Sequence, residues 1–438
     1  MKIPEKPKDS SEVMKSILTS KKNLFKLLDD AQIRSFITKC SQEYIHWDQL
    51  RRKETPKNIN AEDIWAILKM FRSQQYKLFK FNEWQFKYIL LGDTQRKLHL
   101  LDKGAAGNLE TNLTSINQGD KDKYMISSLM EEAIASSQLE GAATTRKIAK
   151  EILRLRRKPR NISEQMIVNG YETMQKIVKM KDKKITPKMI LDLQSSITKD
   201  TLKNQEDEGR FRDNNEVVVG DPFDASKIYH TPPDYKQISK FMDEFCTFAS
   251  DDEGEFIHPI IKGIILHFLI GYIHPFNDGN GRTARTIFYW YVLSRGYWLF
   301  EFMAISRILL HSKVRYGLAY LYTETDENDL TYFINYNLEA MESALIDMEK
   351  YIVKKKQEQQ EAMNLVQGIK DINLRQAGIL KDFIKEPEKH FIIVEVMSNY
   401  NVVYQTARND LLSLTDRGYL EKVKIKNKFV FKLAKKNI

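Results

Sequence analysis

The sequence predicts a mainly α-helical protein, and three observations support this fold class. Among its 438 residues only 18 are glycine and 11 are proline, the two residues that interrupt helices most strongly. Hydrophobic residues make up 42% of the chain, enough to fill the cores of roughly two to three domains. Apolar residues also recur at helical spacing, as within residues 123–139, where one face carries Ile126, Leu129, Met130, Ala133 and Ile134.

The N-terminal region, residues 1–103, is expected to be helical. Residues 22–39 and 60–72 carry apolar residues at helical spacing, and residues 81–101 continue in the same style. Residues 104–122 are rich in glycine and asparagine and therefore predict a loop. This loop separates the N-terminal region from the next unit of the chain.

The middle of the chain predicts a series of helices and one β-hairpin. The helix at residues 123–139 is expected to stop at Gly141, because glycine readily adopts the left-handed conformation that ends a helix. The basic residues 154–160 predict a helix end followed by a solvated loop. Valines favour a strand at residues 216–220, with a turn at 221–224 and a return strand at 227–230. Further helices are expected at residues 166–179, 187–198, 234–249, 257–273 and 282–293.

The last part of the chain, residues 365–438, predicts a winged helix-turn-helix domain. Three helices, at residues 377–384, 392–399 and 404–415, precede two short strands, which is the element order of that domain. The charged residues 354–360 before it either extend a helix or form a linker. The recognition helix would open with residues that can reach bases or phosphates: Tyr404, Gln405, Arg408 and Asn409.

The net charge of +10 suits nucleic acid, an anionic substrate or a solvated lysine-rich surface. Lysines alternate with apolar residues in 421–432, which predicts either a phosphate-contacting wing or an edge strand protected by charge. The chain has only Cys40 and Cys246, which fits a reducing, cytoplasmic compartment. No apolar run approaches the roughly 20 residues of a membrane span, so no membrane partner is expected.

The segment from His274 to Arg285 combines residue types suited to phosphoryl chemistry. The two glycines of Gly279-Asn280-Gly281 lie where a helix is expected to begin, and there free backbone N–H groups can bind phosphate. Asp278 can hold Mg²⁺ against bound phosphates, and His274 has the near-neutral pKa needed to take a proton from a hydroxyl. Arg282 and Arg285 lie three residues apart on one helix face and match phosphate oxygens.

The pattern His274-x-Phe276-x-Asp278-Gly279-Asn280-Gly281-Arg282-x-x-Arg285 resembles the signature of Fic (filamentation induced by cAMP) domain proteins. Every defined position of the motif matches, and the resemblance covers residues 104–350. It implies a helical bundle with a β-hairpin flap. It also implies transfer of AMP from ATP to a Ser, Thr or Tyr hydroxyl of a target protein, and of the protein itself, with release of pyrophosphate.

The resemblance also implies a role for each motif residue. His274 would deprotonate the target hydroxyl, and Asp278 would hold Mg²⁺ between the α- and β-phosphates of ATP. Arg285 would reach the γ-phosphate. Relatives that transfer phosphate instead of AMP carry lysine at the position of Gly281, so glycine favours nucleotidyl transfer. The α- and β-phosphates would be cradled by Gly279, Asn280, Gly281 and Arg282.

A second motif resembles the inhibitory helix of the Fic class that carries this helix before the catalytic motif. Residues 123–141 end in Ser136-x-x-x-Glu140-Gly141, the pattern of that helix. The resemblance implies that Glu140 pairs with Arg285 and thereby occupies the γ-phosphate site. It also implies that the same glutamate can orient water for removal of AMP from a modified protein.

The predicted hairpin, residues 216–230, resembles the flap that aligns a target segment by β-strand addition. The same sequence pattern also fits a hairpin with only a structural role. Its first strand carries Val217, Val218, Val219 and Gly220, which are assigned to the ATP site together with Glu140. Tyr316 resembles the aromatic residue that packs against adenine.

Two partner questions stay open in the sequence. The winged helix domain resembles modules that bind DNA in some proteins and other proteins elsewhere. Residues 1–103 either cover the inhibitory helix or form a homodimer surface. An alternative to the enzyme is a DNA-binding regulator that uses the catalytic fold only as a nucleotide sensor, although a sensor would not need His274.

Overall fold

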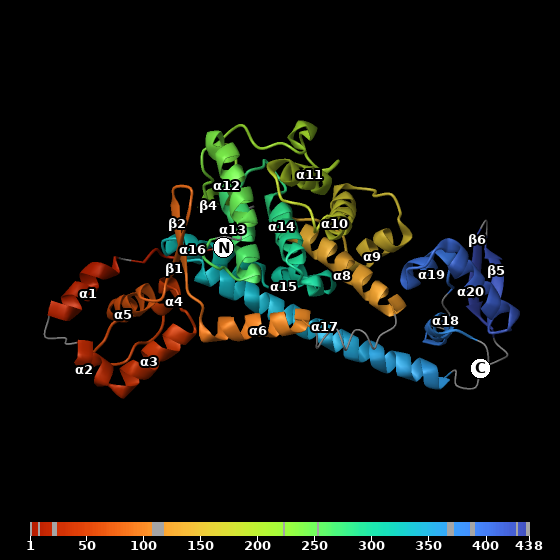
Figure 1. Ribbon diagram of the computed structural model, residues 1–438, viewed down its shortest axis with the longest axis horizontal. Helices are drawn as coiled ribbons and strands as arrows, with labels where there is room; N and C mark the ends of the chain where they lie inside the picture. Colours follow the sequence, from red (N-terminus) through yellow and green to blue (C-terminus); the bar gives the residue numbers. More distant parts are fainter. Residues whose placement is uncertain are drawn as a thin grey trace.

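The computed structural model describes residues 2–7, 9–19, 24–106, 118–221, 224–251, 254–365, 372–385, 390–425 and 428–434. The described chain forms a central helical bundle with a smaller helical unit on either side (Figure 1). The long helix α17, Thr331–Leu365, runs beneath the bundle toward the C-terminal unit. The mainly helical fold predicted from the sequence is confirmed.

The N-terminal unit packs around its own apolar core, which includes Leu50, Ile64 and Ile67. Residues 81–101, expected to be helical, instead contribute to an antiparallel hairpin of β1 (Lys77–Phe81) and β2 (Trp84–Tyr88), followed by α6 (Gly92–Ala106). Aromatic residues occupy every second position, at Phe79 and Phe81 in β1 and at Trp84, Phe86 and Tyr88 in β2, and this two-residue period favours a strand. The helices before the hairpin are α1 (Ser10–Thr19), α2 (Leu24–Asp29), α3 (Ala31–Gln42), α4 (Trp47–Leu50) and α5 (Ala61–Ser73).

The loop predicted at residues 104–122 is wrong at both of its ends, which are helical. Helix α6 extends to Ala106, and α8 (Gln118–Leu139) begins before the predicted helix start at residue 123. Residues 107–117 lie outside the described part of the chain.

The central bundle is built around two buried helices, α13 (Pro259–Ile273) and α14 (Asn280–Ser294), which pack against each other. Most residues of both helices are buried. This burial agrees with the sequence of α13, which is apolar on nearly every side. Around them lie α8, α9 (Arg146–Leu155), α10 (Ile162–Lys179), α11 (Pro187–Thr198), α12 (Ile238–Ser250), α15 (Ile305–His311), α16 (Lys313–Thr325), α17 and the short 3₁₀ helices η1 (Gln205–Asp207), η2 (Tyr235–Gln237) and η3 (Trp298–Phe302).

A buried polar network joins the N-terminal unit to the turn between α16 and α17. The Nζ atom of Lys69 lies 2.7 Å from Oδ1 of Asp326, and the Tyr44 hydroxyl donates to Asp329 over 2.6 Å. Both carboxylates are almost completely buried. Buried charges are tolerated only when they are paired and hydrogen-bonded, so this network fixes how the N-terminal unit sits on the bundle.

The C-terminal unit has the element order predicted from the sequence. Helices α18 (Leu374–Lys385), α19 (Ile393–Tyr400) and α20 (Tyr404–Asp416) precede the antiparallel strands β5 (Leu420–Ile425) and β6 (Lys428–Leu433). The unit has its own core, and α19 packs against α8 and α9 of the bundle. Residues 354–360 extend α17, which resolves the alternative left open by the sequence.

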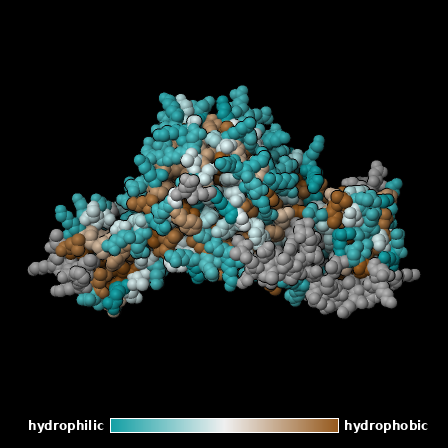
Figure 2. Space-filling model, in the orientation of Figure 1, coloured by the Kyte–Doolittle hydropathy of each residue, from teal (hydrophilic) through white to brown (hydrophobic). Residues whose placement is uncertain are grey.

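The surface seen in Figure 2 is largely hydrophilic, with hydrophobic patches scattered between the units. Among the described residues, no helix is both long and apolar enough to cross a membrane. Cys40 and Cys246 are buried free thiols.

Candidate active site

The candidate site lies where α13 passes into α14. The chain leaves α13 at His274, which adopts a left-handed conformation (φ 49°, ψ 59°), and enters α14 through Gly279 (φ 84°). Asn280 closes the intervening loop, because its side chain accepts from Phe276 N over 3.0 Å and donates to Phe276 O over 2.7 Å. No side chain caps the start of α14, which leaves its first N–H groups available to an anion.

The side chain of Asn280 is therefore committed to holding the loop. Its amide oxygen and nitrogen both bind the backbone of Phe276, and the residue is buried. In a phosphate cradle, Asn280 can contribute its backbone N–H group rather than its side chain.

His274 is held in the form that a general base requires. Its Nδ1 atom lies 3.0 Å from the carbonyl oxygen of Gly271. A carbonyl oxygen only accepts, so Nδ1 carries the proton and Nε2 keeps a lone pair. Burial, with a smaller contribution from nearby His230, lowers the pKa of His274 to about 4. Arg212 donates to the backbone oxygen of His274 over 2.9 Å and steadies the loop.

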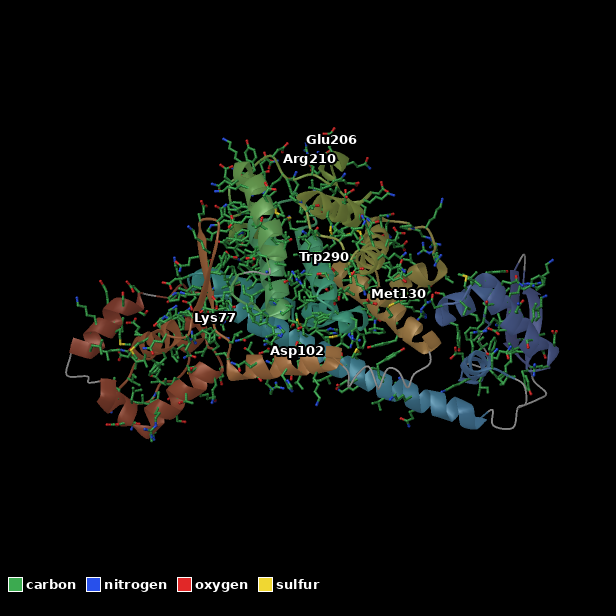
Figure 3. All side chains as sticks on the ribbon, viewed as in Figure 1. Lys77, Asp102, Met130, Glu206, Arg210 and Trp290 are labelled. Carbon is green, nitrogen blue, oxygen red and sulfur yellow. The ribbon has the colours of Figure 1, made fainter. Side chains whose placement is uncertain are left out.

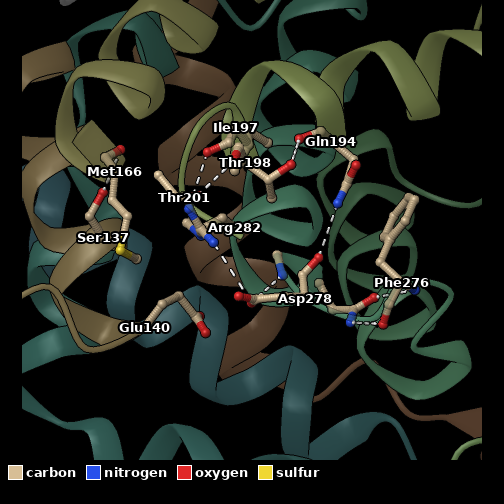
Figure 4. Close-up of polar contacts among 12 residues, drawn as sticks. Ser137, Glu140, Met166, Gln194, Ile197, Thr198, Thr201, Phe276, Asp278 and Arg282 are labelled. Atoms are coloured by element: carbon tan, nitrogen blue, oxygen red, sulfur yellow. Dashed lines mark hydrogen bonds and ion pairs between the residues drawn. The ribbon is translucent and has the colours of Figure 1, made fainter. Parts of the chain in front are cut away.

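Arg282 and Asp278 lie side by side at the mouth of the site (Figure 4). Arg282 donates to the backbone oxygen of Ile197 over 3.1 Å, and its Nη2 atom lies 3.7 Å from Oδ1 of Asp278. The Arg282 side chain is buried, whereas that of Asp278 is 61% exposed. Gln194 donates to the backbone oxygen of Asp278 over 3.2 Å and so fixes its position.

Asp278 is the carboxylate in this loop that a metal ion could use. The described residues contain no group of three or more His, Cys, Asp or Glu side chains placed to hold a metal. Mg²⁺ is commonly held by one or two carboxylates together with substrate phosphates. An exposed Asp278 beside a free helix N-terminus fits that arrangement and would not suit an ion held by protein ligands alone.

Arg285 contacts the last turn of α8 and the residue that follows this helix. Its Nη2 atom lies 2.9 Å from Oε1 of Glu140 and donates over 3.0 Å to the backbone oxygen of Ser136. Its Nε atom donates to the Ser136 hydroxyl over 2.9 Å. The structure thus brings Ser136 and Glu140 of the second sequence motif into contact with Arg285 of the first.

Charge and burial act against each other in this pair. Burial raises the pKa of the Glu140 carboxyl, but Arg285, Arg282 and Lys313 together bring that pKa below its ordinary value. Burial lowers the pKa of Arg285, and Glu140 raises it above its ordinary value. Both groups therefore stay charged at neutral pH. The Glu140 side chain is 32% exposed.

Glu140 also fills the space above Gly281. A Cβ atom built on Gly281 would lie 2.2 Å from Oε1 of Glu140, far inside van der Waals contact. The absence of a side chain at Gly281 is what allows the carboxylate to reach Arg285. The anion cradle and the glutamate therefore compete for the same volume.

Helix α8 itself is firmly attached to the bundle. The buried carboxylate of Glu132 accepts from the Tyr289 hydroxyl and from Ser306 N, each over 2.8 Å. Lys313 donates to the backbone oxygen of Leu139 over 2.7 Å, and Gly141 (φ 97°) ends the helix at the predicted place. The helix that precedes Glu140 is thus held at several points.

The predicted hairpin is present, with shifted strands. Strand β3 (Val219–Asp221) begins three residues later than expected, so Val217 and Val218 precede it, and β4 (Asp224–His230) is longer than expected. Register shifts on both sides of Gly220 shorten the first strand. Residues 222–223 of the predicted turn lie outside the described part of the chain.

His230 anchors this hairpin to the bundle, a contact that sequence reasoning missed. Its Nδ1 atom lies 2.7 Å from Oε2 of Glu324, and its Nε2 atom lies 2.7 Å from the backbone oxygen of Tyr272. Glu324 is 94 residues away in the chain, so no local spacing could have revealed the pair.

Tyr316 lies in an aromatic cluster beside Arg285 rather than at an open surface. Its hydroxyl lies 2.7 Å from Nε2 of His267, and its ring centroid is 5.5 Å from that of Tyr320. Burial lowers the pKa of His267 to about 3, so this histidine is neutral and belongs to the core.

Comparison with known proteins agrees with this site. Residues 184–292, which include the whole 274–285 segment, match the Fic/DOC family model. The matched region thus contains every residue of the candidate site except those contributed by the end of α8 and by α16. The chain is 38% identical over 79 residues to "Protein adenylyltransferase Fic" of Nematostella vectensis, and 31% identical over 83 residues to the protein of the same name of Aedes aegypti.

Each of these matches covers 18% of this chain, and 16% or 17% of the relative. Among solved structures, Fic-1 from C. elegans superposes with a TM-score of 0.50 at 16% sequence identity, covering 79% of this chain and 92% of the other. This likeness shows the shared fold.

Proposed function

We propose that this protein is a protein adenylyltransferase whose resting state is restrained by Glu140. The observation that carries the proposal is the neutral His274 beside the uncapped N-terminus of α14, with Arg282 and Arg285 on the first turns of the same helix. A base for a hydroxyl and a cradle for a polyphosphate then share one site. The names of the matching relatives support the same reaction.

In this reaction the hydroxyl oxygen of a target side chain would attack the α-phosphorus of ATP. The bond between the α-phosphorus and the bridging oxygen breaks, pyrophosphate leaves, and Nε2 of His274 takes the hydroxyl proton. Catalysis would rest on positioning and on charge stabilisation by Arg282, Arg285 and the N–H groups of α14. Mg²⁺ held by Asp278 would neutralise charge on the phosphates.

The hairpin of β3 and β4 would hold the target segment. One exposed hydrophobic residue, Val218, precedes β3, and His230 fixes the far end of β4 to the bundle. A short two-stranded sheet with a free edge can accept a further strand. Tyr316 would lie near the nucleotide through its proximity to Arg285.

Glu140 would restrain the enzyme by taking the place of the γ-phosphate on Arg285. The carboxylate already makes the ion pair that a phosphate would need, and it fills the volume above Gly281. ATP would then bind without its γ-phosphate in place. The same carboxylate could orient water to hydrolyse an AMP–protein bond.

Incubation with Mg·ATP followed by mass spectrometry tests the proposal. The Glu140→Gly protein should acquire AMP on its own hydroxyl groups or on added protein, more than the parent does. Transfer of phosphate alone would refute the assignment.

The second candidate, a DNA-binding regulator that senses nucleotide, is favoured only by the helical order of the C-terminal unit and the exposed lysines of β5. A sensor has no use for a buried neutral histidine. If ATP binds and neither the parent nor the Glu140→Gly protein transfers any group, the sensor is the better account.

A further inference from the structure

A groove of about 830 Å³ separates the central bundle from the C-terminal unit. One wall comes from α8, α9, α10 and the turn between α9 and α10, and the other from α19 and the start of α20. Met130 of α8 lies on the side of the bundle that faces the C-terminal unit (Figure 3). The active-site residues described above take no part in lining this groove.

The turn between α9 and α10 is strongly basic. Residues 154–160 contain five cations and no acidic residue. Arg157 is tied down, because it binds Glu164 over 3.0 Å and the backbone oxygen of Lys158 over 3.0 Å. Arg156 ends α9 in a left-handed conformation (φ 49°), and both Arg156 and Lys158 are exposed where they line the groove.

These two cations have no ion-pair partner within the part of the chain that the structure describes. Arg154 and Arg160, at the ends of the turn, are exposed as well. A concentrated positive charge on a rigid turn attracts an anionic partner more strongly than scattered surface lysines do.

The opposite wall presents the start of α20. Val403 is 69% exposed and Tyr404 is 50% exposed, a high exposure for two large apolar side chains. No side chain caps this helix end, and Gln405 and Arg408 are exposed on its first turns. An aromatic ring, an amide and a cation at an open helix start can contact bases and phosphates together.

We propose that the two walls form one composite surface for double-stranded nucleic acid. The start of α20 would contact base edges and the near backbone, while Arg156 and Lys158 of the bundle would bind phosphates of the same duplex. Exposed Lys422 and Lys424 of β5 extend the positive charge on the C-terminal unit. The surface thus includes residues of the Fic-bearing bundle and not the C-terminal unit alone.

The charges of the surface favour nucleic acid, with its regularly spaced phosphates, over an apolar peptide as the bound partner. Among the charged residues that line the groove, Arg156 and Lys158 face one acidic residue, Glu172, while Arg157 is already paired with Glu164. Neutralised phosphates release counterions, so binding to such a surface weakens steeply with salt. The inference does not depend on AMP transfer.

The test is fluorescence anisotropy of a labelled mixed-sequence DNA duplex with the full chain at about 50 and 200 mM salt. We expect the double variant Arg156→Ala/Lys158→Ala to bind about tenfold more weakly at low salt and to lower the salt slope by about two. Arg408→Ala should weaken binding in the same assay.

The matched control removes two exposed lysines on β1 and α12, at Lys80 and Lys240, elements that lie away from the C-terminal unit (Figure 1). It should bind like the parent. Thermal melting would verify that every variant is folded.

Three results would overturn the proposal. The parent could fail to bind duplex DNA, or the Arg156→Ala/Lys158→Ala variant could bind like the parent while Arg408→Ala loses binding. Polyglutamate could also compete as well as unlabelled duplex, which would indicate an acidic protein partner instead.

Discussion

The carboxylate of Glu140 lies 2.9 Å from the guanidinium of Arg285, at the end of a helix that the bundle holds at several other points. The contact is an ion pair between one partly exposed and one buried side chain. A phosphate can replace this carboxylate, because arginine binds both groups through the same donors. Under the proposed function, Glu140 and the γ-phosphate of ATP would compete for Arg285.

Two replacements of Glu140 should separate the effect of its charge on AMP transfer from the effect of its side-chain volume. Glu140→Gly removes both, and we expect AMP transfer to rise by about tenfold or more, which corresponds to about 1.4 kcal/mol. Glu140→Gln keeps the volume above Gly281 but loses the charge, and its transfer rate should fall between the two. Incorporation of labelled AMP measures all three proteins, and equal rates would show that Glu140 exerts no restraint.

Gly281 should be coupled energetically to Glu140. Gly281→Ala places a methyl group where the Glu140 carboxylate lies, so we expect a loss of about 1–2 kcal/mol in the free energy of unfolding. In the Glu140→Gly background the same change should cost nothing or stabilise by about 0.5–1 kcal/mol, because alanine favours a helix over glycine. Urea unfolding of the four proteins gives the coupling energy, and a coupling near zero would contradict the close contact.

Lys313 should act as a positioning residue for the restraint. It holds the backbone oxygen of Leu139, one residue before Glu140, and its charge helps to keep that carboxylate ionised. Lys313→Met should raise basal AMP transfer a few-fold, and Lys313→Arg should stay near the parent. In the Glu140→Gly background, Lys313→Met should give no further gain, since the group it positions is gone; an additive gain would assign Lys313 another role.

The pH dependence should reflect a buried histidine. His274 must be neutral to accept a proton, and burial lowers its pKa to about 4. In the Glu140→Gly protein, kcat/KM for AMP transfer should therefore stay level from neutral pH to about pH 5 and fall as the pH approaches 4. An acidic limb centred near pH 6.5, the ordinary value for histidine, would mean that His274 is not the base or is open to solvent.

The sequence could group most of the candidate-site residues, because they are close together in the chain. The segment from His274 to Arg285 spans one turn and the first turns of a helix, so spacing alone places its parts. Helix α11 also has the predicted bounds, since Thr186 caps it and Pro187 follows at its first turn.

The remaining contacts depend on residues far apart in the chain. His230 meets Glu324, Lys313 meets Leu139, and Lys69 meets Asp326 only after the bundle has formed. The hairpin of β1 and β2 was missed because each strand has only five residues. So short an apolar pattern fits a helix or a strand.

The central claim is that His274 takes the hydroxyl proton while AMP is transferred at this site. The most direct measurement compares Glu140→Gly with Glu140→Gly/His274→Ala, each incubated with Mg·ATP and analysed by intact-protein mass spectrometry. The account predicts AMP adducts on the first protein and almost none on the second, with ATP binding preserved in both. AMP adducts at equal rates on the two proteins would contradict it.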